Sequence, residues 1–186
     1  IHVVVGDPAG GFDKWEVQSS GELIQEFRNG QPGRMPLDPW PANAGMIPRT
    51  LLSEELGGDR EPIDVLVLGD PIMRGELVRA VPIALLQVVD RLERDDKVIA
   101  VISGTAFADL RSAEDVDRAF PGLLARLAEW YEVSRPGSAI DVQGFGSRPA
   151  AQRLISEGAL AFDPAVRRRT LPNWKSAWQP LASGSG

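Results

Sequence analysis

The stretch Ile63-Asp64-Val65-Leu66-Val67-Leu68-Gly69-Asp70 (IDVLVLGD, 63–70) is the clearest strand signal in this chain. It is an almost continuous run of apolar residues that stops at a glycine and an aspartate. Three other runs have the same form, namely HVVVGD (2–7), KVIAVISGT (97–105) and AIDVQGFGS (139–147). Continuous rather than alternating apolar runs are typical of strands buried on both faces, as in a parallel sheet covered by helices. We therefore expect these four runs to be the core strands of such a sheet.

Apolar residues at helical spacing fill the stretches between the strands. They predict helices at 15–27, 47–56, 76–94, 113–133 and 149–157. Two short additional strands are expected, one at 35–38 between the first two helices and one at 159–162 after the last helix. Ser112 and Asp115 resemble a capping box at the start of the fourth helix, which Pro121 divides. This alternation, with right-handed crossovers, predicts an α/β fold: a three-layer α/β/α sandwich with a mainly parallel, roughly five-stranded sheet, flavodoxin-like in topology.

Composition limits the class of protein. The chain has 186 residues, 43% of them hydrophobic, which suits one full core. We expect a single domain at 1–182 followed by a linker at 183–186. The formal net charge of −6 argues against a nucleic-acid partner, because such binding depends on clustered Lys and Arg. The absence of cysteine excludes a thiol nucleophile, an iron–sulfur cluster and any disulfide.

No apolar run in the sequence approaches the roughly 18 residues that span a bilayer. We therefore expect a soluble protein with no membrane partner, for which the cytoplasm is the favoured compartment, and a protein partner or a small-molecule ligand. The sequence starts directly on a strand without an initiator Met and closes in Ser-Gly-Ser-Gly. We interpret these ends as those of an excised or engineered domain.

The candidate site lies where the strands end. In doubly wound folds ligands bind at the carboxyl ends of the strands, so Asp7, Asp70 and the turns at 103–105 and 144–147 are expected on one rim. Two carboxylates there can hold Mg²⁺ or share acid–base work, which makes Asp7 and Asp70 the candidate catalytic and metal-binding residues. The alternative is that each caps a turn or a helix start. Small residues of the same rim are the candidate ligand-binding residues: Gly10, Gly11, Ser103, Thr105 and Ser147.

Three blocks of the sequence resemble the motifs of the SGNH (GDSL-type) hydrolases. Gly6-Asp7-Pro8 is similar to their Gly-Asp-Ser turn, Asn43-Ala44-Gly45 to their Asn and Gly block, and PIDVLVLGD (62–70) to their third conserved strand. The resemblance covers about residues 2–145. It implies an SGNH-like α/β fold in which Asn43 and Gly45 belong to the ligand-binding residues.

The catalytic residues of that family are missing from these blocks. Pro8 stands at the position of the nucleophilic serine, and a proline offers no hydroxyl for attack. His2 is the single histidine and lies at the start of the first strand, so the closing Asp-x-x-His motif has no counterpart. The resemblance therefore implies a degenerate active site and a binding, scaffolding or regulatory module. The alternative is a metal-assisted hydrolase or a phospho-switch that uses Asp7 and Asp70.

Two further resemblances keep a phosphate or metal site open. The runs at 63–76 and 98–106 resemble two strands of response-regulator receiver domains, which would assign Asp70 to phosphate, Asp7 to Mg²⁺ and Ser103 or Thr105 to the switch. The paired acids and the lysine of receivers have no counterpart. The turn at 7–11 resembles the metal motif of von Willebrand A domains but lacks its two hydroxyl residues.

Overall fold

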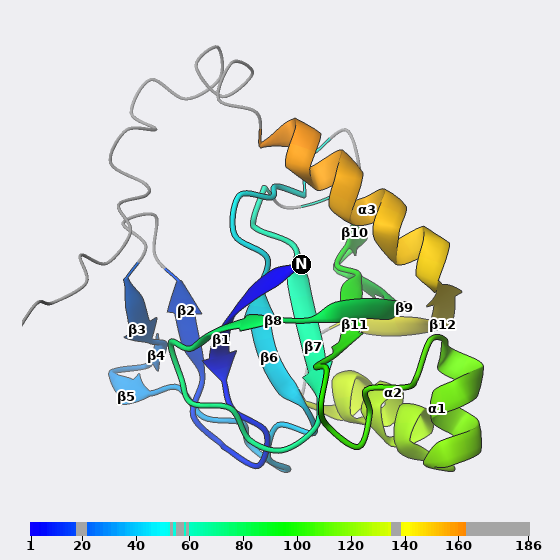
Figure 1. Cartoon of the computed structure of the whole chain (residues 1–186). Helices are drawn as coiled ribbons and strands as arrows, with labels where there is room; N and C mark the ends of the chain where they lie inside the picture. The colour runs from blue at the N-terminus through cyan, green and yellow to red at the C-terminus, as the bar shows by residue number, and fades with distance from the viewer. Residues whose placement is uncertain (18–21, 53, 55–57, 59, 135–138, 163–186) are drawn as a thin grey trace, which may run out of the picture.

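The computed structural model describes residues 1–17, 22–52, 54, 58, 60–134 and 139–162. Most of its strands join one curved sheet that runs through the centre of the molecule (Figure 1). The strands of this sheet are β1 (His2–Asp7), β6 (Asn43–Met46), β7 (Asp64–Leu68), β8 (Leu77–Arg79), β9 (Val81–Asp90), β10 (Glu93–Arg94), β11 (Lys97–Val101) and β12 (Ile140–Ser147). Their order is β10-β9-β11-β7-β6-β1-β8, with β12 paired to β9.

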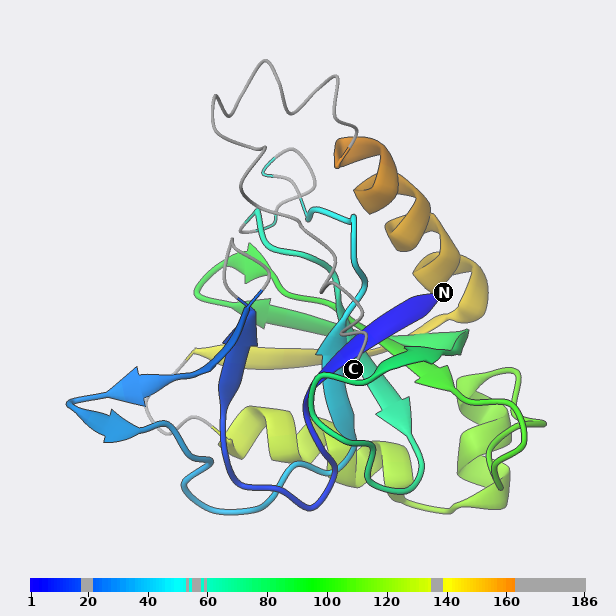
Figure 2. The ribbon, with the colours of Figure 1, turned by 60° about the vertical axis from the view of Figure 1, so that its left-hand side comes forward.

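Two hairpins and three helices complete the described structure. The hairpins are β2 (Trp15–Val17) with β3 (Leu23–Gln25), and β4 (Phe27–Arg28) with β5 (Gln31–Pro32). The β4–β5 hairpin projects away from the main sheet (Figure 2). The helices are α1 (Ala113–Ala119), α2 (Leu123–Val133) and α3 (Arg148–Ala161). None of the helices in the described residues is long and apolar enough to cross a membrane.

The strands of the main sheet pair mostly antiparallel. Among the described pairs, only β7 and β11 run parallel, with Val65 opposite Val98. The expected three-layer sandwich with a mainly parallel, flavodoxin-like or SGNH-like sheet is therefore wrong. The four apolar runs do form β1, β7, β11 and β12. The composition of these runs indicated burial on both faces. For β1, β7 and β11 that condition is also met by an antiparallel sheet that is covered on both sides, whereas β12 is only half-buried.

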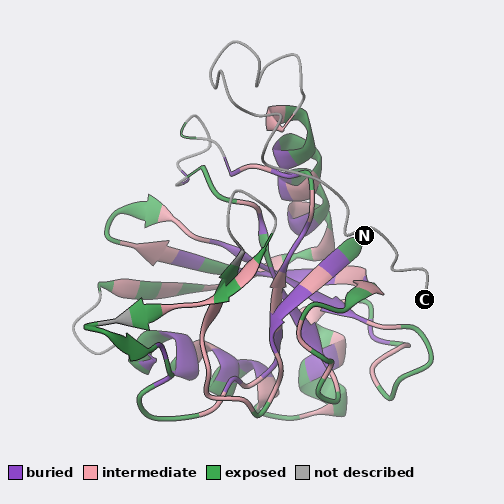
Figure 3. Ribbon diagram, turned by 90° about the vertical axis from the view of Figure 1, so that its left-hand side faces the viewer, coloured by how far each residue is buried: buried purple, intermediate pink, exposed green. Residues whose placement is uncertain are grey.

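Apolar residues pack on both faces of the sheet. On one face, Leu66 and Ile99 pack with Leu127 and Trp130 of α2. On the other face, Val65 and Val98 pack with residues of α3 that include Leu154. Figure 3 shows buried residues along the central strands and on the inward sides of the helices. Successive residues of one strand thus enter two different cores, which explains why the strands are apolar without alternation.

The helix predictions were correct only after residue 110. Ser112 caps α1 by accepting a hydrogen bond from the Asp115 backbone N–H, and α1 and α2 divide near Pro121, as expected. α3 covers the predicted 149–157 and continues through the stretch expected as a strand at 159–162. The other expectations were wrong: 15–27 and 76–94 contain strands, 35–38 is not a strand, and the described residues of 47–56 form no α-helix. Residues 183–186 lie outside the described residues.

The hairpin between β9 and β10 explains the error at 76–94. Asp90 pairs with Glu93, so the loop consists of Arg91 and Leu92 alone, with φ of 51° and 74°. A two-residue loop with positive φ at both positions is of type I′, and such loops usually contain Asn-Gly. The sequence carries no such signal here, and a long apolar run without a turn signal is compatible with either helix or strand.

Candidate active site

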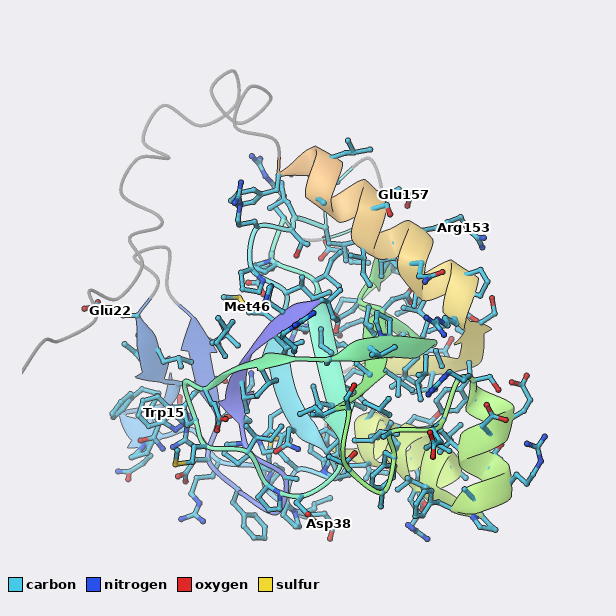
Figure 4. The ribbon with its side chains drawn as sticks, in the orientation of Figure 1. Trp15, Glu22, Asp38, Met46, Arg153 and Glu157 are labelled. Atoms are coloured by element: carbon cyan, nitrogen blue, oxygen red, sulfur yellow. The ribbon has the colours of Figure 1, made fainter. Side chains whose placement is uncertain are left out.

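A cavity of about 590 Å³ opens on the face of the sheet that carries α2. Its walls come from β1, β2, β6, the first residues of β7 and β11, and the end of α2. Trp15 and Met46, which both line it, approach from the hairpin and from the sheet (Figure 4). The charged residues that line it are Asp7, Lys14, Glu16, Arg49, Arg60, Glu61, Asp64 and Lys97.

A buried lysine held by two carboxylates lies in the wall of this cavity. Lys97 Nζ donates to Asp64 Oδ2 and to Asp95 Oδ1, both at 2.5 Å. The Lys97 side chain is only 4% exposed, whereas that of Asp64 is 51% exposed. Asp64 and Lys97 meet because they are the first residues of the parallel strands β7 and β11. Burial opposes the charge of Lys97, but Asp64 and Asp95 outweigh it and hold the pKa of Lys97 well above its usual range.

Asp7 also lines the cavity, and unlike Asp64 it is buried. It ends β1, is 5% exposed, and accepts a hydrogen bond from the Trp15 backbone N–H at 3.0 Å. Burial raises the pKa of Asp7 from 3.8 to about 7, against the opposing effects of that hydrogen bond and of the positive charges of Arg74 and Lys14. The cavity therefore contains a carboxyl that changes its protonation near neutral pH, as catalytic acids and bases require.

Two cations support the wall around Asp7. Arg74 stacks over the Trp15 ring at 4.3 Å and donates from Nε to the Gly6 carbonyl at 2.9 Å. Lys14, which lines the cavity, forms a 2.6 Å ion pair with Glu26, and both side chains are largely buried. The positive charge of Lys14 is thus neutralised within the protein.

Asn43 connects the turns that follow Asp7 and Asp70. Its Oδ1 accepts from the backbone N–H groups of Ala9 and Ile72, at 3.0 and 2.8 Å. Its Nδ2 donates to the carbonyls of Val67 and Asp70. The two turns therefore lie at the same edge of the sheet, as the sequence suggested. Asp7 lines the cavity, whereas Asp70 is exposed and is not among the lining residues.

The glycines of the predicted site lie in two places. Gly45 is on β6 and lines the cavity, and a Cβ there would overlap the Val4 carbonyl of the neighbouring strand. Gly10 and Gly11 form the turn after β1, away from the lining residues. The Gly10 N–H donates to the Trp40 carbonyl, and the Gly11 carbonyl accepts from the Trp40 N–H, both at 2.8 Å. The turn is thus fastened to Trp40, whose side chain lines the cavity.

The remaining predicted ligand-binding residues lie outside the cavity. Ser103 borders a separate groove beside Met73 and Leu77. Thr105 Oγ1 donates to the Ile102 carbonyl at 2.8 Å and accepts from the Phe107 N–H, which closes a turn. Ser147 caps α3 by accepting from the Ala150 N–H at 3.4 Å.

Sequence reasoning missed the residues that surround the cavity opening and its buried lysine. These are Lys14, Arg49, Arg60, Asp64, Asp95 and Lys97. The available signal was a charged residue at the start of two apolar stretches: Asp64 before the apolar residues 65–68 and Lys97 before 98–102. The predicted site lay instead at the carboxyl ends of the strands, as a fully parallel sheet would require.

A family model described as inorganic pyrophosphatase matches residues 3–163, nearly the whole described structure. The chain belongs to the inorganic pyrophosphatase family. It is 37% identical over 155 residues to the inorganic pyrophosphatase of Aeropyrum pernix, covering 81% of this chain and 82% of that protein. It is 30% identical over 161 residues to that of Saccharolobus solfataricus, covering 84% and 88%. The membership overturns the SGNH (GDSL-like) hydrolase assignment.

Solved pyrophosphatase structures share the fold. That of Helicobacter pylori superposes with a TM-score of 0.75 at 23% identity, over 87% of this chain and 92% of that one. A Trypanosoma cruzi vacuolar soluble pyrophosphatase in complex with PPi superposes with a TM-score of 0.83 at 23% identity, over 90% and 70%. The shared architecture is a mixed, mostly antiparallel, OB-fold-like sheet. The expectation of a degenerate, non-catalytic scaffolding module is likewise wrong, since the family is one of enzymes.

Proposed function

We propose that this chain hydrolyses inorganic pyrophosphate to two orthophosphates in the cavity beside Lys97. The observation that carries the proposal is the buried Lys97 held between Asp64 and Asp95 in the wall of a cavity, in a chain of this family. In the reaction a water oxygen bonds to one phosphorus and the bridging P–O bond breaks. Phosphoryl transfer needs little covalent chemistry from the protein, so positioning and charge compensation are the main demands on the site.

The carboxylates of this group suit Mg²⁺ that arrives with the substrate. Among the described residues no three Asp, Glu or His side chains are arranged to hold a metal ion. Mg²⁺ commonly binds through one or two carboxylates together with substrate phosphates, and Asp64 and Asp95 meet that requirement with hard oxygen donors. When bound there, Mg²⁺ would neutralise charge on the phosphate oxygens.

Lys97 and Asp7 have different parts in the proposal. Lys97 stays protonated, because two carboxylates hold its ammonium group, and it fixes the positions of both carboxylates. Asp7 accepts the proton that the attacking water loses, since its pKa of about 7 leaves a substantial ionised fraction at neutral pH. The hydrogen bond from the Trp15 N–H fixes the orientation of the Asp7 carboxyl.

The test is orthophosphate release from pyrophosphate, with and without MgCl₂, by the parent protein and by Asp64→Asn. We expect the parent to release orthophosphate only with Mg²⁺, and Asp64→Asn to lose at least about 100-fold in kcat. Asp117→Asn is the matched control, because Asp117 is exposed on α1 and its replacement removes the same charge. A folded parent protein that releases no orthophosphate, or an Asp64→Asn variant as active as the control, would contradict the proposal.

A further inference from the structure

Two arginines that line the cavity have a backbone conformation that their residue type disfavours. Arg49 has a φ of 62° and Arg60 a φ of 71°. In the left-handed region a Cβ crowds the following carbonyl oxygen, and glycine is the usual residue. Residues held in such conformations cluster at binding and catalytic sites, where the surrounding structure maintains them. Two of them at one cavity therefore call for a functional explanation.

Hydrogen bonds made by adjacent residues hold the backbone around both arginines in place. Next to Arg49, the buried Thr50 donates from Oγ1 to the Ile47 carbonyl at 2.7 Å and accepts from the Ile63 N–H at 3.0 Å. The Arg60 N–H donates to the Leu52 carbonyl at 2.8 Å, and the Leu52 N–H donates to the Glu61 carbonyl at 2.8 Å. These bonds link the residues that follow β6 to the residues that precede β7. Arg49 therefore lies on one side of this hydrogen-bonded connection and Arg60 on the other.

The charges around the cavity leave these two guanidinium groups available for an anion. The other two cations that line it are committed within the protein: Lys97 to Asp64 and Asp95, and Lys14 to Glu26. Among the described residues Arg49 makes no ion pair.

Arg60 makes one loose ion pair, at 3.6 Å, with the exposed Glu54. Both arginines are exposed at the cavity. Of the four cations that line the cavity among the described residues, these two exposed arginines are therefore the ones available to a phosphate group, because both lysines are held by carboxylates.

We propose that Arg49 and Arg60 bind a terminal phosphate group of the substrate and determine its affinity. The proposal rests on the proposed pyrophosphate hydrolysis in the same cavity. Guanidinium groups present paired N–H donors that match phosphate oxygens, and these charge-assisted bonds are stronger than neutral ones. The strained backbone is maintained because it directs two such groups to one cavity.

The experiment compares Arg49→Gln and Arg60→Gln with the parent protein and with Arg153→Gln. Arg153 is exposed on α3, away from the cavity (Figure 4), and its replacement removes the same charge. Calorimetry without added metal measures the affinity for pyrophosphate, and turnover with Mg²⁺ measures KM and kcat. Loss of one charge-assisted contact should weaken affinity and raise KM about 10- to 100-fold, with kcat changed less and the control unchanged.

The outcomes separate this inference from the proposed function. If the parent hydrolyses pyrophosphate and both variants keep its KM and affinity, the arginine site is overturned while hydrolysis stands. If the parent binds pyrophosphate through these arginines but releases no orthophosphate, the arginine site stands and the proposed hydrolysis fails. A loss of affinity equal to that of Arg153→Gln would also overturn the site, because it would reflect only the net charge.

Discussion

Replacing Asp7 by asparagine should stabilise the protein, and the gain should increase with pH. Asp7 is 5% exposed, and burial raises its pKa from 3.8 to about 7. Below pH 3.8 the carboxyl is protonated in both the folded and the unfolded state. As pH rises to 7 the unfolded state releases its proton while the folded state retains it, so stability falls across this interval and levels off above it.

The size of the effect follows from the two pKa values. Linkage gives a loss of about 1.7 kcal/mol at pH 5 and about 4 kcal/mol at pH 8, relative to a residue that stays neutral. An asparagine side chain at this position would have nearly the same shape, and its amide oxygen could still accept from the Trp15 N–H. The advantage of Asp7→Asn over the parent should therefore grow by about 2.5 kcal/mol between pH 5 and pH 8.

Urea unfolding followed by tryptophan fluorescence, at unit steps from pH 5 to pH 8, measures this difference. Asp70→Asn is the matched control, because Asp70 is exposed and lies outside the cavity lining. Its free energy of unfolding should stay within about 0.5 kcal/mol of the parent. A difference between Asp7→Asn and the parent that does not change with pH would refute the reasoning, since it would mean that Asp7 ionises at its ordinary pKa in the folded protein.

Two further substitutions test the charges and the strain at the cavity. Lys97→Met should destabilise the protein by about 1–3 kcal/mol in urea unfolding, because it leaves two adjacent carboxylates, both with access to water, without their cation. An unchanged free energy of unfolding would mean that the ion pairs of Lys97 do not contribute to stability. Arg60→Gly should raise the free energy of unfolding by about 0.5–1 kcal/mol, since relief of about 1–2 kcal/mol of left-handed strain exceeds the about 0.5–1 kcal/mol that glycine costs. The same variant should bind pyrophosphate more weakly, and a fall in its stability would contradict the strain argument.

The sequence was sufficient to locate three of the core strands, β1, β7 and β11, but it did not orient them, and it took the core strand β9 for part of a helix. The runs that became β1, β7 and β11 are apolar enough to identify strands buried on both faces, whereas β12 contains no fully buried residue. The direction of a strand depends on its connections, and the connecting segments carried misleading signals. The stretch at 76–94 has apolar residues at spacings that suit a helix, yet Arg91 and Leu92 turn it back as a hairpin without any glycine or asparagine.

The expectation of a parallel sheet also placed the candidate site at the carboxyl ends of β7 and β11, whereas the cavity lies at their amino ends. β7 and β11 do run parallel, and the expectation that their matching ends lie together was sound for this pair. At the carboxyl ends of these two strands, this expectation brought together Asp70 and Ser103, which lie outside the cavity. Applied at the amino ends, it would have joined Asp64 to Lys97, the two charged residues that open these strands. Because a charge at the start of a strand buried on both faces needs a partner, such an opposite pair is itself a sequence signal for a polar site within the sheet.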